Sequence, residues 1–409
     1  MGRLSGVERS RSSFRRLGAN ALLALSLAGC QAASATPSAP PATPANTQAI
    51  AAKPSQLPSA APTVHPSPTI APSPPPGGIY AATVTGLLSA SVQDIPARVW
   101  VPNERGSKVV VIDPATFEIV DRIDVGAYPE HVSPSWDGQL LYVNDMHTDF
   151  MSIIDPRTAK VVGRVAAPSP YNLYFTPAGD RAIVVEDMLQ GAPKEENGLR
   201  FFTYPGFKEV GFLPIRWAGA DHLDFSADGK TLYLSCEYSA RVEVVDVASM
   251  KVRTDIVVGG LPTDVRLAPD GGRLFVANQQ LNGVTVIDVT TNQQIGFVKL
   301  GKGSHGLSLS RDARSLYVTN RIAGSVSVVD IATLDVRDTW AIDGSPDMIA
   351  VSADGAQLWI SNRWDRTVVV VDSATGKVIK TIATGAYPHG LAYWPLPGRF
   401  SLGHNGNMR

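Results

Sequence analysis

The sequence is poor in cysteine: Cys30 and Cys236 are the only two among its 409 residues. A disulfide framework needs several paired thiols, and the chain beyond Cys30 has no pair to offer. The fold must therefore be stabilised by a hydrophobic core, for which the chain is long enough. Cys236 closes an apolar run, and we interpret it as a small packed side chain.

An excess of either charge is also missing. The 36 basic side chains nearly balance the 37 acidic ones. Removal of residues 1–29, which contain five arginines and one glutamate, leaves 31 basic and 36 acidic side chains. A dominant nucleic-acid-binding surface would carry a basic excess, so we expect no nucleic-acid partner.

The apolar run at the N-terminus is short. Residues 17–29 are interrupted only by Asn20 and Ser26, and they follow a basic flank. At a helical rise of about 1.5 Å per residue they reach roughly 20 Å, less than the ~30 Å core of a bilayer. The pattern indicates a secretory signal. It ends in Leu27-Ala28-Gly29-Cys30, which resembles the bacterial lipobox and implies lipidation of Cys30. The alternative is an ordinary signal peptide with a chance cysteine.

Residues 30–78 have few apolar side chains that could form a core. They consist mainly of Ala, Pro, Ser and Thr, and residues 31–78 contain 13 of the 31 prolines. Such a segment cannot offset its own ordering entropy. We predict a disordered tether, after a signal peptide at 1–29, that holds a folded domain away from a membrane. The expected location is extracytoplasmic, with the chain anchored as a lipoprotein facing the periplasm or the cell surface.

Helical periodicity with caps is absent from the rest of the chain, which instead repeats a strand pattern. The segment Leu316-Tyr317-Val318-Thr319-Asn320 has counterparts in other repeats, and each is followed by a run such as residues 326–330. Each repeat contains about four strand-like runs separated by turn signals. The residues that close the third run are mostly 42 apart: Asp113, Asp155, Thr203, Asp246, Asp288, Asp330 and Asp372.

This period predicts an all-β fold, a seven-bladed β-propeller of four-stranded antiparallel blades. The first repeat lacks a first strand, and residues 389–394 are a spare copy of one. We therefore expect the C-terminal strand to pair with the N-terminal blade, which closes the ring and removes its edges. The predicted propeller spans residues 79–396, although residues 79–96 match no strand position. Residues 397–409 are interpreted as an irregular extension that emerges on the face of the first-to-second turns.

The motif Tyr-Val-Thr-Asn at 317–320, together with Pro388-His389-Gly390-Leu391, resembles the YVTN β-propeller repeat family. The resemblance covers roughly residues 97–395. It implies a bacterial extracytoplasmic propeller, related to surface-layer repeats and to the propellers of haem d1 and lactonase-type enzymes. The family is functionally mixed, so the resemblance implies no particular reaction.

Propeller geometry makes one face more promising than the other. The face with the first-to-second turns carries tight Asp-Gly turns. The opposite face has the starts of the inner strands and varied polar side chains around the mouth of the central channel. The candidate ligand-binding residues there are Glu130, His131, Asp221, His222, Asp264, His305, Asp347 and His389, joined by Arg321, Arg363 and Trp364 from the second-to-third loops. The competing interpretation is that inner strands simply end in solvated polar residues.

Several other chemical signatures are absent or out of context. The Gly-x-Gly-x-x-Gly match at 301–306 lies between strands and opens no helix. No Cys-x-x-Cys-His motif is present for covalent haem. The histidines lie on different repeats, and no local spacing brings them together, so we predict neither a metal site nor a cofactor. His404 and Met408 are not assigned as haem ligands.

Two further patterns are interpreted structurally. Asp224 and Arg266 occupy matching positions in adjacent repeats, which favours an inter-blade ion pair. The aromatic residues at one repeat position are expected in the core between blades: Trp100, Tyr142, Tyr233, Phe275, Tyr317 and Trp359.

The leading functional hypothesis is a monomeric, membrane-tethered propeller without chemistry of its own. It would bind an unknown small molecule or an envelope protein at the channel mouth. One alternative is a lactonase-like hydrolase that uses imidazole or carboxylate groups of the mouth as a general base: Glu130, His131, His222, His305 and His389. Another is a redox partner associated with haem or a quinone.

Overall fold

The computed structural model describes residues 78–186 and 197–409. The predicted signal peptide, Cys30 and the tether up to residue 77 lie outside the described residues, and so does most of the lengthened loop at 187–198. None of the short helices in the described part of the chain has the length and apolar character of a membrane span.

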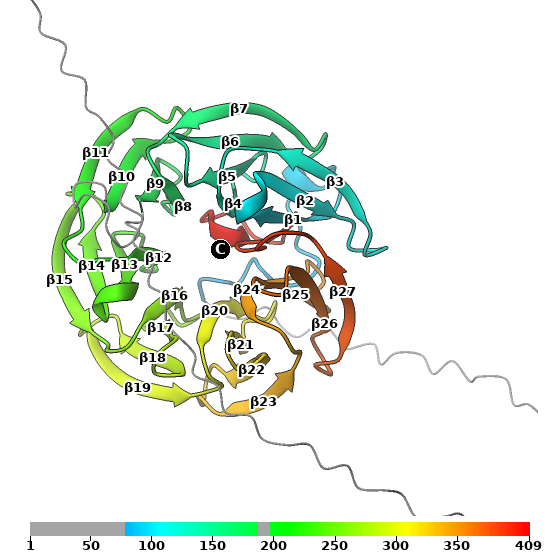
Figure 1. Cartoon of the computed structure of the whole chain (residues 1–409). Helices are drawn as coiled ribbons and strands as arrows, with labels where there is room; N and C mark the ends of the chain where they lie inside the picture. The colour runs from blue at the N-terminus through cyan, green and yellow to red at the C-terminus, as the bar shows by residue number, and fades with distance from the viewer. Residues whose placement is uncertain (1–77, 187–196) are drawn as a thin grey trace, which may run out of the picture. The chain divides into compact units, whose positions relative to one another are not determined.

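Seven four-stranded antiparallel sheets form a ring, as the repeat predicted (Figure 1). Within each sheet the strands run in chain order outward from the centre, except that the first sheet begins with the last strand. The strands are, blade by blade: β28 (Ala392–Trp394), β1 (Arg98–Asn103), β2 (Lys108–Ile112), β3 (Ile119–Asp124); β4 (Pro129–Pro134), β5 (Leu141–Asp145), β6 (Phe150–Asp155), β7 (Lys160–Ala166); β8 (Pro170–Phe175), β9 (Arg181–Glu186), β10 (Gly198–Thr203), β11 (Glu209–Pro214); β12 (Ala220–Phe225), β13 (Thr231–Cys236), β14 (Arg241–Asp246), β15 (Lys251–Val257); β16 (Pro262–Leu267), β17 (Arg273–Asn278), β18 (Gly283–Asp288), β19 (Gln293–Lys299); β20 (Ser304–Leu309), β21 (Ser315–Asn320), β22 (Ser325–Asp330), β23 (Val336–Ala341); β24 (Pro346–Val351), β25 (Gln357–Asn362), β26 (Thr367–Asp372), β27 (Val378–Ala383).

The inner three strands of a blade are buried, whereas the outermost strand is mostly exposed. The four consecutive valines of β26 are buried. In β27, which lies outside it, every side chain except that of Ile382 is exposed to solvent. Runs of β-branched residues are favoured where both faces of a sheet pack against neighbouring blades. The repeated aromatic position lies in this core, as predicted: Trp100 and Trp359 are fully buried, and the Tyr233 hydroxyl donates to the Val289 carbonyl near the next blade.

The aspartate that marks each repeat closes the turn between third and fourth strands. The Asp330 carboxylate accepts from the backbone N–H groups of Ala332 and Thr333 at 2.8 and 2.9 Å. Such an Asx turn fixes the chain direction without a glycine. In the third blade the Thr203 hydroxyl accepts from the N–H of Lys208 instead, so the departure in sequence keeps the turn.

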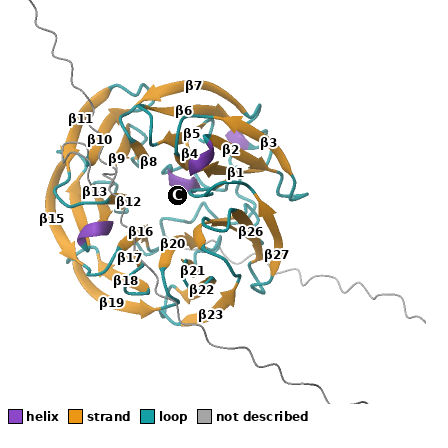
Figure 2. Ribbon diagram, in the orientation of Figure 1, coloured by secondary structure: helices purple, strands orange, loops and turns teal. Residues whose placement is uncertain are grey.

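Ring closure occurs as expected. β28 pairs antiparallel with β1, with Trp394 opposite Arg98 and Ala392 opposite Trp100. The regular part of this strand is shorter than the predicted 389–394, because Gly390 instead bridges to His131 of the neighbouring blade. Four short 3₁₀ helices complete the described residues: η1 (Ala90–Val92), η2 (Glu104–Gly106), η4 (Glu237–Ser239) and η5 (His404–Gly406) (Figure 2).

The C-terminal extension is mostly buried, which its Gly- and Asn-rich sequence did not indicate. After Trp394 the chain turns and enters the centre of the ring, where Figure 1 marks its end. Gly403 bridges to Tyr174 on β8, and η5 packs against β4. Gly403, with φ of 92°, would place any Cβ 2.3 Å from the Leu173 carbonyl oxygen, so only glycine allows this close approach. The extension therefore plugs the channel from the side of the first-to-second turns.

Residues 79–96, which matched no strand, cross that same side. The Ile79 N–H donates to the Pro269 carbonyl, and the Thr85 hydroxyl donates to the Asp354 carbonyl. The Gln139 side-chain amide donates to the Ser91 carbonyl. The Tyr80 hydroxyl reaches the Leu267 carbonyl at 3.0 Å. This segment ties blades together on the face opposite the candidate site.

Candidate functional site

A recurring irregularity at the start of the inner strands positions the candidate residues. Between Ala220 and Leu223, Ser304 and Leu307, and Pro346 and Ile349, the pairing with the second strand shifts. The two residues skipped in each strand include the candidates Asp221 and His222, His305, and Asp347. Released from regular pairing, their side chains can be directed into the channel.

A hydroxyl group on the second strand holds this irregular backbone. The Thr319 hydroxyl accepts from the Gly306 N–H at 2.8 Å and donates to the Asp347 carbonyl of the next blade. Ser235 and Ser361 accept from His222 and Met348 in the same way. The threonine of the Tyr-Val-Thr-Asn motif thus supports the geometry of the channel mouth.

Seven charged or ionisable side chains converge at the mouth, and we call them the mouth cluster: Glu104, Glu130, His305, Arg321, Asp347, Arg363 and His389. His389 Nδ1 lies 2.6 Å from the Glu130 carboxylate and 3.8 Å from that of Glu104. Both Arg321 and Arg363 pair with Asp347, and Arg363 also contacts Glu104 at 2.5 Å. The cluster joins four blades, since its residues come from the first, second, sixth and seventh.

Burial governs the protonation of the mouth cluster. Desolvation and the neighbouring carboxylates raise the pKa of Glu104 to about 8 and, against the pull of Arg363, that of Glu130 to about 7. Burial would also raise the pKa of Asp347, but Arg321 and the adjacent imidazoles outweigh it and hold that pKa well below its usual range. Burial, reinforced by the arginines, lowers the pKa of both His305 and His389.

A second group of histidines lies beside the mouth cluster, and we call His131, His222 and His404 the histidine cluster. The three rings are fully buried, with centroids 4.6 to 5.3 Å apart. His131 lies on β4, His222 on β12 and His404 on the C-terminal extension. One ligand atom of each lies within 4.8 Å of the others, as do atoms of Glu130, His131 and His389.

Carboxylates and amides surround the histidine cluster. His222 Nδ1 is 2.7 Å from the Asp221 carboxylate, and His404 Nε2 is 4.0 Å from that of Asp264. Burial opposes a charge on His222, yet Asp221 outweighs it and raises the pKa of His222 to about 9. Burial and the neighbouring imidazoles hold the pKa values of His131 and His404 well below their usual range.

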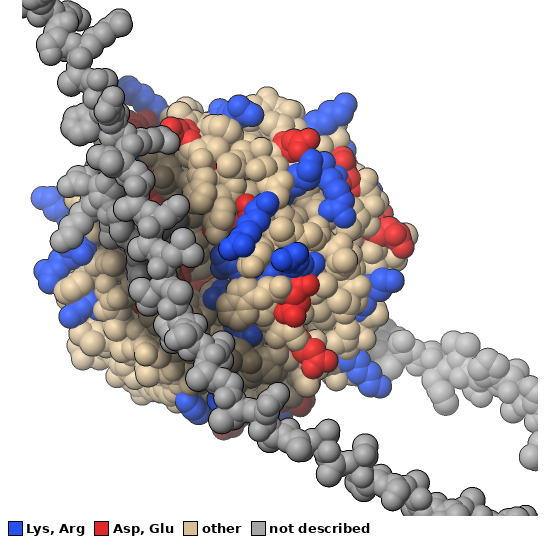
Figure 3. All heavy atoms as spheres, in the orientation of Figure 1, with Lys and Arg blue, Asp and Glu red and all other residues tan. Residues whose placement is uncertain are grey.

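The outer rim of the mouth is basic and aromatic. The Arg105 and Arg366 guanidinium groups lie 4.1 and 5.9 Å from the centre of the Tyr387 ring. Trp364 is 54% exposed, and Arg321 lies 5.7 Å from its ring centre. On the face drawn in Figure 3, Lys and Arg side chains gather near the centre of the ring.

The residues predicted from the sequence thus divide into two groups. Glu130, His305, Asp347, His389, Arg321 and Arg363 belong to the mouth cluster, with Trp364 at its rim. His131, Asp221, His222 and Asp264 form or flank the histidine cluster. Cys30 lies outside the described residues.

Sequence reasoning missed His404 and Asn405. Their position beyond the last strand, in a Gly- and Asn-rich stretch, carried no repeat signal. The expected ion pair between Asp224 and Arg266 is also corrected. Asp224 pairs with Arg409 of the C-terminal extension at 2.7 Å, while Arg266 donates to the Leu307 carbonyl and lies 3.9 Å from Asp264. Cys236 is a buried free thiol, as interpreted.

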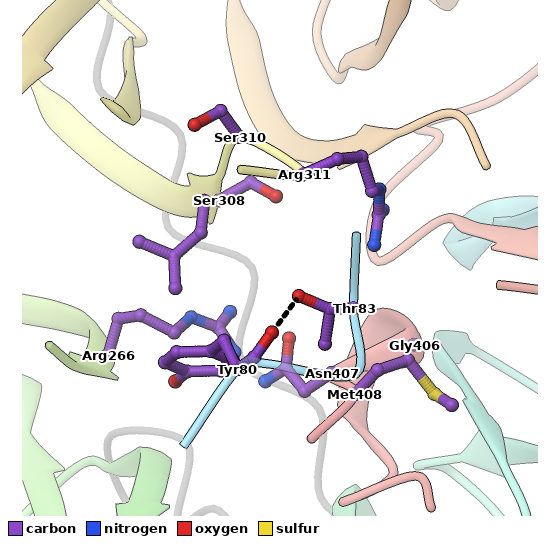
Figure 4. A pocket seen from close by; sticks show the side chains of 10 residues that line it. Tyr80, Thr83, Arg266, Ser308, Ser310, Arg311, Gly406, Asn407 and Met408 are labelled. Carbon is purple, nitrogen blue, oxygen red and sulfur yellow. Dashed lines mark hydrogen bonds between the residues drawn. The ribbon is translucent and has the colours of Figure 1, made fainter. Parts of the chain in front are cut away.

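A small cavity lies on the opposite side, where the C-terminal extension meets the ring (Figure 4). Tyr80, Thr83 and Arg311 line it, together with Asn407 and Met408 of the extension. Its volume of about 40 Å³ leaves room for only a few water molecules. It contains none of the histidines or carboxylates described above, so it is not a rival to the mouth.

Comparison with known proteins supports the fold and leaves the chemistry open. The structure is similar to a functionally unknown protein from Desulfotomaculum acetoxidans DSM 771, at 19% identity and a TM-score of 0.64, over 72% of this chain and 98% of that one. It is also similar to the periplasmic gluconolactonase PpgL of Pseudomonas aeruginosa, at 18% identity and a TM-score of 0.62, over 74% and 99% of the two chains. A third similar structure is the dihydro-haem d1 dehydrogenase NirN, at 18% identity and a TM-score of 0.56, over 79% and 83%.

Identities this low show a shared fold alone. Among curated proteins, none matches the sequence. The family model of the YNCE-like beta-propeller, however, matches residues 78–397, which is most of the chain. The seven-bladed ring, its closure and this match together place the chain in the YNCE-like β-propeller family.

Proposed function

We propose that this protein is a lipid-anchored, extracytoplasmic propeller that binds an anionic small molecule at the channel mouth. The observation that carries the proposal is the convergence of two arginines at the channel mouth. Two arginines, Arg321 and Arg363, converge on a single firmly ionised carboxylate, Asp347. The other two carboxyl groups of the cluster have pKa values raised to about 8 and about 7, so they are largely or partly protonated at neutral pH.

A buried positive charge without a counter-charge is costly. A carboxylate or phosphate ligand would supply that counter-charge, and guanidinium groups bind such anions through paired hydrogen bonds. Arg105 and Arg366 at the rim would attract the ligand, while Trp364 and Tyr387 offer flat apolar contact. The location rests on the basic flank, the short apolar run and the lipobox-like Leu27-Ala28-Gly29-Cys30.

Thermal unfolding of the full-length protein in detergent tests the binding. Gluconate, citrate and inorganic phosphate are the probes, each with chloride at matched ionic strength as the reference. We expect at least one probe to raise the unfolding temperature in the unmodified protein, and Arg321→Ala or Arg363→Ala to abolish that shift. An Arg314→Ala variant, changed on the opposite face, is the control. Equal shifts in all variants would show that the mouth arginines are not the site.

Hydrolysis of a lactone is a second candidate function, favoured by one contact. His389 and Glu130 lie 2.6 Å apart beside a second carboxyl group, and such a pair can take a proton from water. The water oxygen would add to the lactone carbonyl, the ring C–O bond would break, and the leaving oxygen would take up the proton. The fold is shared with a gluconolactonase.

Release of acid from glucono-1,5-lactone, followed in weakly buffered solution, separates the two functions. Turnover that exceeds the spontaneous rate and is lost in His389→Ala would establish the hydrolase. Binding of gluconate without turnover would establish the non-catalytic propeller.

A further inference from the structure

Unpaired ring nitrogens distinguish the histidine cluster from ordinary packed histidines. Nε2 of His131, of His222 and of His404 is buried and has no hydrogen-bond partner within the described residues. A buried polar atom is normally paired, because leaving it unpaired forfeits its hydration without replacement. The three rings come from three separate segments, and their centroids lie 4.6 to 5.3 Å apart.

The other ring nitrogen of each histidine faces an oxygen. His131 Nδ1 lies 3.1 Å from Asn405 Oδ1, and His404 Nδ1 lies 2.8 Å from Asn172 Oδ1. Amide and carboxylate oxygens accept hydrogen bonds, so this arrangement selects the tautomer with the proton on Nδ1. The lone pair of Nε2 is then free on both rings.

His222 follows the same pattern with a carboxylate in place of an amide. Its Nδ1 lies 2.7 Å from Asp221 Oδ1. An imidazole whose second nitrogen is held by a carbonyl or carboxylate oxygen is the usual arrangement of a metal-binding histidine.

The spacing also suits a single ion. Three nitrogens bound to one tetrahedral ion at about 2.0–2.1 Å are separated by roughly 3.4 Å. The ligand atoms of the cluster lie within 4.8 Å of one another, so each would move by under about 1 Å to bind. The Asp264 carboxylate, 4.0 Å from His404 Nε2, is the nearest acidic group for a fourth position.

We propose that His131, His222 and His404 bind one divalent first-row transition ion of the zinc and copper type. Imidazole nitrogen suits these ions, whereas calcium and magnesium prefer oxygen ligands. The neighbouring set of Glu130, His131 and His389 is a weaker candidate, because Glu130 and His389 already contact each other at 2.6 Å.

The proposed ion has a structural consequence that an ordinary packed histidine would lack. His404 belongs to the C-terminal extension, while His131 and His222 belong to the second and fourth blades. A bound ion would fasten the extension to the ring from within the channel. Metal should therefore stabilise the fold, and this effect should depend on His404.

Metal titration of the full-length protein in detergent, after treatment with a chelator, tests the proposal. Zn(II) and Cu(II) are the probes, followed by calorimetry at neutral pH. We expect one ion per chain for each probe, with Cu(II) bound at least as tightly as Zn(II). His222→Ala and His404→Ala should each weaken binding by more than about 100-fold, beyond the loss expected for an outer partner.

Two further measurements keep the result independent of misfolding. Circular dichroism establishes that each variant is folded, and His147→Ala, changed on an exposed histidine stacked on Tyr128, is the control. The electron paramagnetic resonance spectrum of the Cu(II) form should show coupling to several imidazole nitrogens, fewer in His404→Ala. Zn(II) should raise the unfolding temperature of the unmodified protein and not of His404→Ala.

Several outcomes would overturn the proposal. One is the absence of stoichiometric binding by the folded protein. A second is binding retained by folded His222→Ala and His404→Ala but lost in His389→Ala, which would place the ion in the mouth cluster. Because these readouts use no anionic ligand, they are independent of the function proposed for the mouth.

Discussion

Arg409 and Asp224 form a buried ion pair across the centre of the ring. The guanidinium group donates to the carboxylate at 2.7 Å and to the Phe225 carbonyl at 2.6 Å, and both side chains are at most 2% exposed. Asp224 also accepts from the Leu267 N–H on the next blade. The C-terminal extension is therefore coupled to the fourth and fifth blades.

Arg409→Ala should destabilise the protein by about 3–5 kcal/mol, because it leaves the buried carboxylate without its cation. Chemical denaturation followed by tryptophan fluorescence measures the change. Arg399→Ala, which removes an exposed arginine of the same extension, is the control and should change stability by less than about 0.5 kcal/mol. Equal stability of the two variants would contradict the role of the pair.

Glu104 should make stability depend on pH. Its pKa is raised from 4.5 to about 8 in the folded protein, first by burial and then by Glu130. The folded state therefore binds the proton more tightly than the unfolded state, and stability falls as pH rises from about 4.5 to about 8, by up to a few kcal/mol. Glu104→Gln should flatten this dependence, whereas Glu118→Gln, on an exposed residue, should leave it unchanged. Unfolding midpoints at pH 5.5 and pH 8 provide the comparison.

Thr319→Val should cost about 1–3 kcal/mol of stability, because the buried Gly306 N–H and the Asp347 carbonyl lose their shared partner. It should also weaken anion binding, since both backbone groups belong to the channel mouth. Thr381→Val, on an exposed outer strand, is the isosteric control. Denaturation and the thermal-shift assay measure the two effects, and an unchanged mouth in Thr319→Val would argue against the hydroxyl as a support of the site.

Gly390→Ala should displace His131. A Cβ at this position would lie 1.9 Å from His131 Nδ1, which is closer than any real contact. We expect weaker Zn(II) binding together with lower stability. Gly296→Ala, where the nearest atom would be 3.8 Å away, tests the general cost of such a change. Unaltered Zn(II) affinity in a folded Gly390→Ala protein would contradict the placement of His131 among the ligands.

Cys30→Ala should release the protein from the membrane if the lipobox-like motif is used. Labelled palmitate incorporation and cell fractionation measure lipidation and location. Ser34→Ala, a change in the adjoining part of the predicted tether, is the control. Labelling that persists in Cys30→Ala would refute lipidation at this residue.

Most of the fold could be predicted because its signal is repeated along the chain. Comparison of one repeat with another shows the 42-residue spacing of the turn aspartates, the alternation within each strand and the spare strand at residues 389–394. The turn hydrogen bonds of Asp330 and the pairing of Trp394 with Arg98 confirm them. The candidate residues of the mouth could also be predicted, because equivalent positions of successive repeats lie in a circle around the central channel.

Contacts within the site were not predictable in this way. Asp221 and Asp347 occupy equivalent positions in the inner strands of two blades. They nevertheless belong to different clusters, because the side chains around the channel are not symmetric. His404 meets His131 across 273 positions of the chain, and no periodicity reaches beyond the last strand.

The amino-acid sequence alone was sufficient to determine the number of blades, the way the ring closes and the face on which polar groups gather. Each of these follows from a pattern that every repeat restates. Tertiary packing alone decided three features: the path of residues 397–409 into the channel, the partner of Asp224, and the convergence of three histidines. They depend on which buried surfaces of distant segments fit together, and that fit is a property of the assembled ring.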